Sequence, residues 1–312
     1  MDFSLSEEQE LLQQTAHKLL ERECPPALVR AHVDDPSVYA SLWRHLSEYT
    51  ALGAGPAADL CLFLEETGCA VAPGPFLATA TFTSLTGDVD RTGTVALVDD
   101  RTHPFVLEVD RVERIAVVTP GPRLAVLDTA DVNARFVSTV DYSRRLFQVE
   151  LPAGVDGAPL DPDALCRWRD RAHASLAAEM VGTARRTFEM SLAYAKERRQ
   201  FDVPIGSFQA IQHKLADMSL ALERATAAVH YAAMTIDGDD PHRSRACHVA
   251  KAAAGDAARR ILKDGIQIHG GIGYTWEHDL HFYLRRAAAD EYLFGSTGWH
   301  LDRIAALLID GA

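Results

Sequence analysis

Helical periodicity marks the N-terminal part of the chain. Ser6 and Gln9 have the spacing of a capping box, and apolar residues then recur at helical spacing between residues 11 and 20. A pair of prolines at 25–26 ends this run, because proline lacks the backbone N–H that a helix interior needs. A second helix is expected from about residue 57 to residue 67.

The hydrophobic period shortens between about residues 93 and 151. Short β-branched or apolar runs follow one another here, separated by turn signals such as Pro120-Gly121. Several short strands at close spacing predict a small antiparallel sheet or barrel. The segment 153–163, with two prolines and two glycines, is an expected linker. The runs are Thr94–Val98, Phe105–Val109, Arg114–Val118, Leu124–Leu127 and Leu146–Leu151.

The helical period returns from about residue 162. Apolar positions from Ile211 to Val229 step by three and four residues, which is typical of the seam of a helix bundle. An alanine-rich helix is expected over 244–268, and two further helices over 279–289 and 298–309.

This order of elements predicts a mainly α fold with a small β-domain. We expect an N-terminal helical domain over 1–90 and a reduced middle β-domain over 91–155. A C-terminal four-helix bundle is expected over 156–312.

The predicted bundle holds more apolar surface than one layer of helices can bury. Soluble monomers rarely expose apolar patches larger than about a few hundred Å². We therefore expect a stable interface with another chain, above about 2,000 Å² in total. The apolar surface in question is the 211–229 seam, the 246–258 face, Ile304, Leu307, Leu308 and Ile309.

Composition and charge exclude several classes of protein. The chain has 312 residues with 31 Lys and Arg against 44 Asp and Glu, a net charge of −13, which argues against binding to nucleic acid or anionic membranes. No apolar stretch approaches the roughly 20 residues of a membrane span. The acidic N-terminus resembles neither a secretory signal nor a transit peptide, so a cytoplasmic location is expected.

Cysteine and histidine spacing indicates no metal site. The five cysteines are scattered without a CxxC motif, so we expect reduced thiols rather than disulfides or zinc ligands. No HExxH or comparable histidine spacing occurs. His242, His248 and His269 are therefore expected to be solvated or packed imidazoles.

Two stretches in the C-terminal part are more specific than composition or periodicity. Residues 198–209 read RRQFDVPIGSFQ, and residues 267–275 read QIHGGIGYT. In this order and in a helical region, they resemble motifs of the acyl-CoA dehydrogenase family of flavoproteins. The resemblance extends over nearly the whole chain and is weakest across 90–152.

The resemblance implies an FAD that is held mainly by a neighbouring subunit. Arg198 offers a guanidinium to the pyrophosphate, and the backbone at Gly270 and Gly271 can approach the phosphates closely because no Cβ intervenes. The open alternative is that the glycines are only a helix C-cap and Arg198 a surface cation. The implied cofactor-binding residues are Arg198, Phe201 (a flat apolar face), Gln209 and Gln267 (ribose or adenine edges), Gly270 and Gly271.

The family's catalytic base has no counterpart in this chain. Members remove the α-proton of an acyl-CoA with a glutamate while the flavin takes the β-hydride. The two positions where the family places that glutamate correspond here to Phe294 and Ala172, and neither side chain accepts a proton. Glu291 is a possible substitute, although an ion pair with Arg285 or Arg286 is the expected role of a carboxylate at this place.

These features resemble the short subunit of heteromeric α2β2 bacterial acyl-CoA dehydrogenases. The family's flavin-ring motifs are missing from the middle part, and the resemblance implies that a longer homologous chain supplies the base and the acyl-CoA channel. It also implies a bulky acyl-CoA substrate, a class that includes CoA thioesters of steroid side chains or rings, and electron-transfer flavoprotein as acceptor. Two alternatives stay open: a self-sufficient homo-oligomer with a relocated base, and a non-redox scaffold subunit.

Overall fold

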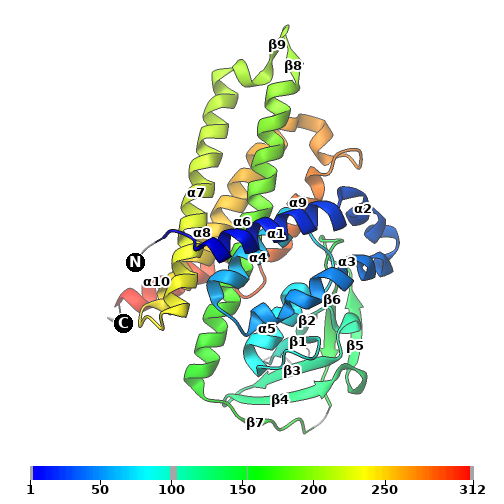
Figure 1. The fold of residues 1–312 in the computed structure, drawn as a ribbon, viewed down its shortest axis with the longest axis vertical. Coiled ribbons are helices and arrows are strands. Elements are labelled where there is room, and N and C mark those ends of the chain that lie inside the picture. Colours follow the sequence, from blue (N-terminus) through cyan, green and yellow to red (C-terminus); the bar gives the residue numbers. More distant parts are fainter. Residues whose placement is uncertain (1–2, 99–103, 153, 310–312) are drawn as a thin grey trace.

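The structure, a computed structural model, describes residues 3–98, 104–152 and 154–309. Figure 1 shows a group of short helices and small sheets packed against one side of a set of long helices. The first helix begins at the predicted capping box. Gln9 N–H donates to the Ser6 hydroxyl, and Ser6 N–H donates to the Gln9 side-chain oxygen, both at 3.2 Å. The N-terminal helices are α1 (Glu7–Glu23), α2 (Pro26–Asp34), α3 (Tyr39–Leu46), α4 (Ala57–Cys69) and α5 (Phe76–Thr86).

Two small sheets follow the N-terminal helices. One has the strand order β1-β3-β4-β7 and the other β2-β6-β5. The strands are β1 (Gly93–Leu97), β2 (Phe105–Leu107), β3 (Arg114–Thr119), β4 (Arg123–Asp128), β5 (Asn133–Val137), β6 (Leu146–Glu150) and β7 (Ala158–Pro159).

The expectation of a purely antiparallel sheet is wrong for one pair of strands. β1 and β3 run parallel, with Gly93 opposite Arg114 and Leu97 opposite Val118. A parallel pair needs a crossover connection. Here the chain between the two strands passes through β2 in the other sheet, so β3 enters beside β1 from the same end.

The long helices form the C-terminal part. The seam at 211–229 lies within α7, and the alanine-rich segment forms most of α8, as predicted. Figure 1 shows α6, α7 and α8 side by side, with the small β8–β9 hairpin at their upper end. The division of the chain into three domains at 90 and 155 stays a prediction. The elements are α6 (Pro162–Glu197), β8 (Arg199–Gln200), β9 (Val203–Pro204), α7 (Gln209–Asp237), α8 (Arg243–His269), α9 (Leu280–Asp290) and α10 (Thr297–Ile309).

Two glycines allow α4 and α6 to cross in backbone contact. A Cβ at Gly68 would lie 2.0 Å from the Glu179 carbonyl oxygen, and one at Gly182 would lie 1.8 Å from the Glu65 carbonyl oxygen. Real Cβ atoms do not approach backbone this closely, so the crossing depends on both residues being glycine. This contact joins the N-terminal helices to the bundle.

The apolar faces that were expected to be exposed are mostly buried within the chain. Met218, Leu222 and Val229 on α7 and the alanines on the inner face of α8 belong to the main core, because α7 and α8 pack on each other and on α6. Ile304 and Leu307 are half-buried. Among the described residues 211–309, the large apolar side chains that are more than half exposed are Leu220, Tyr274, Trp276, Tyr292, Leu301, Leu308 and Ile309.

Among the helices that the structure describes, none combines the length and the apolar character of a membrane span.

Candidate functional site

The two sequence motifs lie at the same end of the helix bundle. Tyr194, near the end of α6, stacks on His269, the last residue of α8, with ring centroids 4.5 Å apart. Lys214 in the second turn of α7 forms an ion pair with Asp264 on α8. The ends of α6 and α8 therefore meet the start of α7, and the fold brings the first motif close to the second.

Arg198 caps α6 at the base of the β8–β9 hairpin. Its backbone N–H donates to the Tyr194 carbonyl, and its own carbonyl accepts from Ile205 N–H, both at 2.8 Å. The backbone is thus fixed, but the side chain is exposed. Within the described residues, no carboxylate pairs with the Arg198 guanidinium, which leaves it free for an external anion.

Phe201 stands at the tip of this hairpin. Phe201 and Asp202 form its two-residue turn, and both have positive φ (53° and 65°), as a type I′ turn requires. The Phe201 side chain is 87% exposed, and its ring forms a T-shaped pair with the ring of Phe208, with centroids 6.2 Å apart. Gln209 follows as the first residue of α7 and is also exposed.

The backbone conformation requires glycine at position 270 but not at position 271. Gly270 ends α8 with φ 66° and ψ −147°, a conformation that is essentially restricted to glycine, so its role as a helix cap is confirmed. Gly271 has no positive φ. A Cβ at either position would meet nothing within 4 Å, so the space in front of both is open to an incoming group.

A groove of about 1000 Å³ opens beside these glycines, between α8, α9 and α10. Gln267, Gly270 and Gly271 line it, and Arg259 and Lys263 add positive charge. Arg198, Phe201 and Gln209 lie outside this groove, on the hairpin and at the start of α7. The groove thus offers the exposed backbone of two glycines, the amide of Gln267 and two cationic side chains. These hydrogen-bond donors fit an anionic dinucleotide such as FAD.

The two positions that correspond to the family's base lie in one apolar cluster. Ala172 on α6 and Phe294 after α9 both belong to a group that includes Trp168, Val118 and Leu165. Trp168 meets the Phe294 ring at 6.4 Å and 87°, and its indole N–H donates to the Thr81 carbonyl at 2.9 Å. Apolar side chains thus fill the space around both positions.

Glu291 has a structural role that the sequence did not predict. Its carboxylate accepts from Thr297 N–H at 2.8 Å and from the Thr297 hydroxyl at 2.9 Å, so it caps α10. The expected ion pair with Arg285 or Arg286 is wrong, because the Arg286 side chain turns into the core and Arg285 donates to the Val140 carbonyl. Glu291 also lines the groove.

A buried ionic network, which no sequence pattern predicted, joins the β-region to the bundle. Arg286 pairs with Asp141 and Glu179 at 2.7 Å each, and Arg144 pairs with Glu179 at 2.6 Å and with Asp290. Burial raises the pKa of Asp290 above its usual value, and the Arg144 guanidinium opposes that rise. The YLRRAA run contains Arg286 but does not indicate its partners, because Asp141 and Glu179 lie more than a hundred residues away along the chain.

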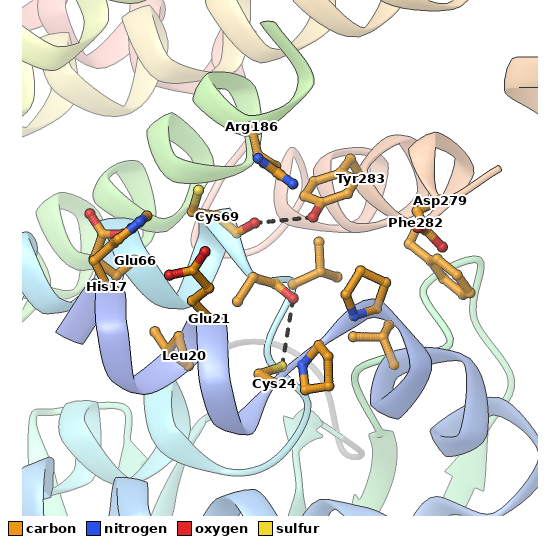
Figure 2. A pocket seen from close by; sticks show the side chains of 15 residues that line it. His17, Leu20, Glu21, Cys24, Glu66, Cys69, Arg186, Asp279, Phe282 and Tyr283 are labelled. Carbon is orange, nitrogen blue, oxygen red and sulfur yellow. Dashed lines mark hydrogen bonds and ion pairs between the residues drawn. The ribbon is translucent and has the colours of Figure 1, made fainter. Parts of the chain in front are cut away.

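A second cavity of about 170 Å³ lies between α1, α4, α6 and α9 and contains none of the predicted site residues. Figure 2 shows the Tyr283 hydroxyl, which donates to the Cys69 carbonyl at 3.1 Å, and the Cys24 thiol, which faces the Ala70 carbonyl at 3.7 Å. His17 closes one side with a 2.9 Å contact to Glu66.

Comparisons with known proteins agree on one family. Residues 170–309 match the model of the acyl-CoA dehydrogenase C-terminal domain. The chain is 33% identical to acyl-CoA dehydrogenase IpdE2 of Mycolicibacterium smegmatis, over 97% of this chain and 99% of that protein.

Solved structures show the same fold. A variant of the Tcur3481–Tcur3483 steroid ACAD superposes with a TM-score of 0.86 at 26% identity, over 99% of both chains. The ChsE4–ChsE5 complex from Mycobacterium tuberculosis superposes with a TM-score of 0.83 at 21% identity, again over 99% of both chains.

Proposed function

This chain belongs to the acyl-CoA dehydrogenase family of FAD-dependent oxidoreductases that act on CH–CH bonds, and we propose that it completes the flavin site of a longer partner subunit. In this proposal the partner supplies the catalytic glutamate and the acyl-CoA channel. The two chains together desaturate a bulky acyl-CoA between its α and β carbons.

One observation carries the proposal: residues suited to hold the cofactor face outward, whereas the base positions are apolar. The Arg198 side chain and the Gly271 backbone are exposed. Phe294 and Ala172 pack in a cluster with Trp168. A chain built in this way can bind part of a dinucleotide at its surface, but these two positions cannot remove an α-proton.

Each outward-facing residue has a distinct role in the proposed site. Arg198 pairs with the FAD pyrophosphate, and the peptide groups at Gly270 and Gly271 lie against its phosphates. Phe201 covers an apolar face of the cofactor, and Gln209 and Gln267 hydrogen-bond to its ribose or adenine. The bound flavin supplies the hydride acceptor.

The partner is proposed to cover the groove and its apolar rim. Tyr274, Tyr292 and Leu301 line the groove and are 67%, 78% and 55% exposed. Leu308 and Ile309 extend the exposed apolar surface along α10. Aromatic and apolar side chains of this kind are typical of the core of an obligate interface, here above about 2,000 Å² in an α2β2 assembly.

The steroid ACAD supports a steroid-derived acyl-CoA as the substrate class, since it shares the fold over its full length at 26% identity. The two-part name of that protein supports a heteromeric assembly. Electron-transfer flavoprotein is the proposed acceptor of the electrons.

Co-expression tests this proposal. The chain purified alone is expected to be colourless, and to reduce no acceptor when FAD and a steroid side-chain CoA thioester are added. The chain purified with a longer homologous chain, which carries a glutamate at a family base position, is expected to be yellow and active. Activity of the chain alone would instead support a homo-oligomer with Glu291 as a relocated base, and a colourless, inactive complex would support a scaffold.

A further inference from the structure

Three buried histidines meet where α6, α8 and α10 come together. They are His173 on α6, His248 on α8 and His300 on α10, and none is more than 9% exposed. One ring nitrogen from each lies within 4.8 Å of the corresponding nitrogens of the other two. Because the three residues are far apart in the sequence, no local spacing indicates the cluster, and His248 was expected to be an ordinary packed imidazole.

The hydrogen bonds of His300 define its tautomer. Its Nε2 lies 3.1 Å from the Phe294 carbonyl oxygen, which can only accept, so Nε2 carries the hydrogen. In the neutral ring, Nδ1 of His300 then presents a lone pair, and it faces Nδ1 of His248 at 2.8 Å. A carbonyl that fixes the far nitrogen is the arrangement that orients histidine ligands in metal sites.

His173, the third member of the cluster, has a ring nitrogen without a hydrogen-bond partner. Its side chain is 6% exposed, and its Nδ1 is buried without a hydrogen-bond partner in the described part of the chain. Its ring lies 5.2 Å from the His248 ring and 4.8 Å from the His300 ring, measured between centroids. A buried polar atom without a partner is rare in folded proteins, and a bound ion would satisfy it.

Binding of a metal at these atoms requires a change of tautomer in His248. Because His300 Nδ1 accepts, the 2.8 Å contact in the metal-free protein is a hydrogen bond from His248 Nδ1–H, and a metal bound at His248 Nδ1 would need that hydrogen to lie on Nε2 instead. The cations near the cluster include Lys251, Arg303 and Arg169, and the carboxyl groups of Glu291 and Asp290 lie near Lys251.

We propose that His173, His248 and His300 bind one divalent transition-metal ion, with Zn²⁺ as the best match. Three neutral imidazoles with a fourth position for water form a familiar Zn²⁺ ligand set, with Zn–N distances of about 2.0–2.1 Å. Ligand nitrogens in such a tetrahedron are about 3.3 Å apart. The present separations, from 2.8 Å up to 4.8 Å, lie on both sides of that value, so small ring rotations bring the three into place.

The ion would hold α10 against α6 and α8. His300 is the buried residue of α10, whereas Leu301, Leu308 and Ile309 on the same helix are more than half exposed. An ion shared by three helices would fix the first turn of α10, and with it the loop that carries Phe294. This role does not depend on the flavin or on a partner chain.

Metal binding by the purified chain tests the proposal. The wild-type chain, stripped with a chelator and then given Zn²⁺, is expected to retain one Zn²⁺ per chain after gel filtration and to give the visible absorption of tetrahedral Co²⁺ when cobalt is added instead. His173→Gln and His300→Gln should each weaken Co²⁺ affinity at least about tenfold and reduce its absorption intensity.

His281→Gln is the matched control. His281 is also a buried histidine, and both of its ring nitrogens lack partners among the described residues, but it lies on α9 outside the cluster. This variant should bind Co²⁺ as the wild type does. The proposal is overturned if the wild type retains no ion, or if the cluster variants and the control bind Co²⁺ alike. If a cluster variant does not fold, retention of the ion by the wild type still decides the proposal.

Discussion

Gly270 and Gly271 are neighbours that the structure distinguishes clearly. Gly270 is required by its own backbone conformation, with φ 66° and ψ −147°. Gly271 has no positive φ, and a Cβ added to it would meet no atom within 4 Å, so nothing in the part of the chain that the structure describes explains its lack of a side chain. A cofactor phosphate held against its backbone would explain it.

Alanine at these two positions should therefore have different effects. Gly270→Ala is expected to lower the free energy of unfolding by about 1–3 kcal/mol through backbone strain. Gly271→Ala should leave the stability of the isolated chain unchanged but weaken FAD binding in the complex at least tenfold. Urea unfolding and FAD titration measure the two effects. Unchanged FAD affinity in Gly271→Ala would show that the cofactor does not approach this backbone.

Arg198 provides the test of charge recognition. Arg198→Ala should weaken FAD binding to the complex by roughly 10- to 150-fold, because a charge-assisted hydrogen bond contributes about 1.5–3 kcal/mol. The exposed Arg44 on α3, far from the hairpin, is the matched control, and Arg44→Ala should not alter FAD affinity. Equal FAD affinity in the Arg198 and Arg44 variants would remove Arg198 from the site.

At the scale of elements, α6 connects the parts of the molecule. Along its 36 residues it carries Ala172 in the apolar cluster, Glu179 in the ionic network and Gly182 at the crossing with α4, and Arg198 caps its end. The position of the hairpin relative to the apolar cluster is therefore set by one rigid helix.

The α4–α6 crossing should be very sensitive to a single methyl group. Gly182→Ala places a Cβ against backbone atoms, the Glu65 oxygen at 1.8 Å and the Cys69 nitrogen at 2.9 Å. We expect it to destabilise the fold by about 3 kcal/mol, even though alanine favours a helix over glycine by about 1 kcal/mol. Gly55→Ala, with its nearest contact at 3.7 Å, is the control, and equal urea midpoints for both variants would contradict the close crossing.

The histidine cluster should make stability depend on pH. Burial lowers the pKa of His248 to about 4 and of His300 to about 3, below the value of 6.5 expected in the unfolded chain. Between these values the unfolded chain binds protons that the folded chain does not. Stability is therefore full above pH 6.5 and is lost as the pH falls, by up to about 1.4 kcal/mol per pH unit for each histidine.

The pH dependence of stability is measured on protein treated with a chelator, so that no metal is bound to the histidines. His248→Gln should flatten the decline in the free energy of unfolding between pH 6.5 and pH 4.5. His242→Gln, which changes an exposed histidine, should decline as the wild type does. A wild-type slope that neither variant alters would mean that His248 is not buried in its neutral form.

The sequence predicted the elements whose burial follows a regular period. The capping box of α1, the seam of α7 and the alanine-rich α8 were found because each has one continuous buried face. The strand β5 was missed because it is short, largely exposed and without a regular alternation of polar and apolar residues, and β7 because two residues have no period. The parallel pairing of β1 with β3 depends on contacts distant in the sequence.

The residues of the candidate site also differ in whether the sequence alone indicates them. Arg198 and Gln267 lie in continuous motifs, so reading along the chain is enough to propose them as site residues. The ionic network around Arg286 and the cluster around His173 unite residues from separate elements, so only the folded structure brings them together. The capping of α10 by Glu291 was hidden for the same reason.

At the scale of the whole molecule, the residues proposed to bind the cofactor face outward, and the two positions that correspond to the family's base lie in an apolar cluster. The groove between α8, α9 and α10 is lined by exposed aromatic and apolar residues that a partner can bury. The central claim is that catalysis is divided between two chains, with cofactor contacts in this one and the base in the other.

Flavin reduction in the assembled complex tests that claim most directly. A steroid side-chain CoA thioester is added anaerobically, and the loss of flavin absorbance is followed in two variant complexes. We predict that Glu291→Gln in this chain leaves the rate within about twofold of the wild type. Glutamine at the base position of the partner should slow it by about 10²–10⁴-fold. Loss of flavin reduction in the Glu291 variant, with normal reduction in the partner variant, would contradict the account.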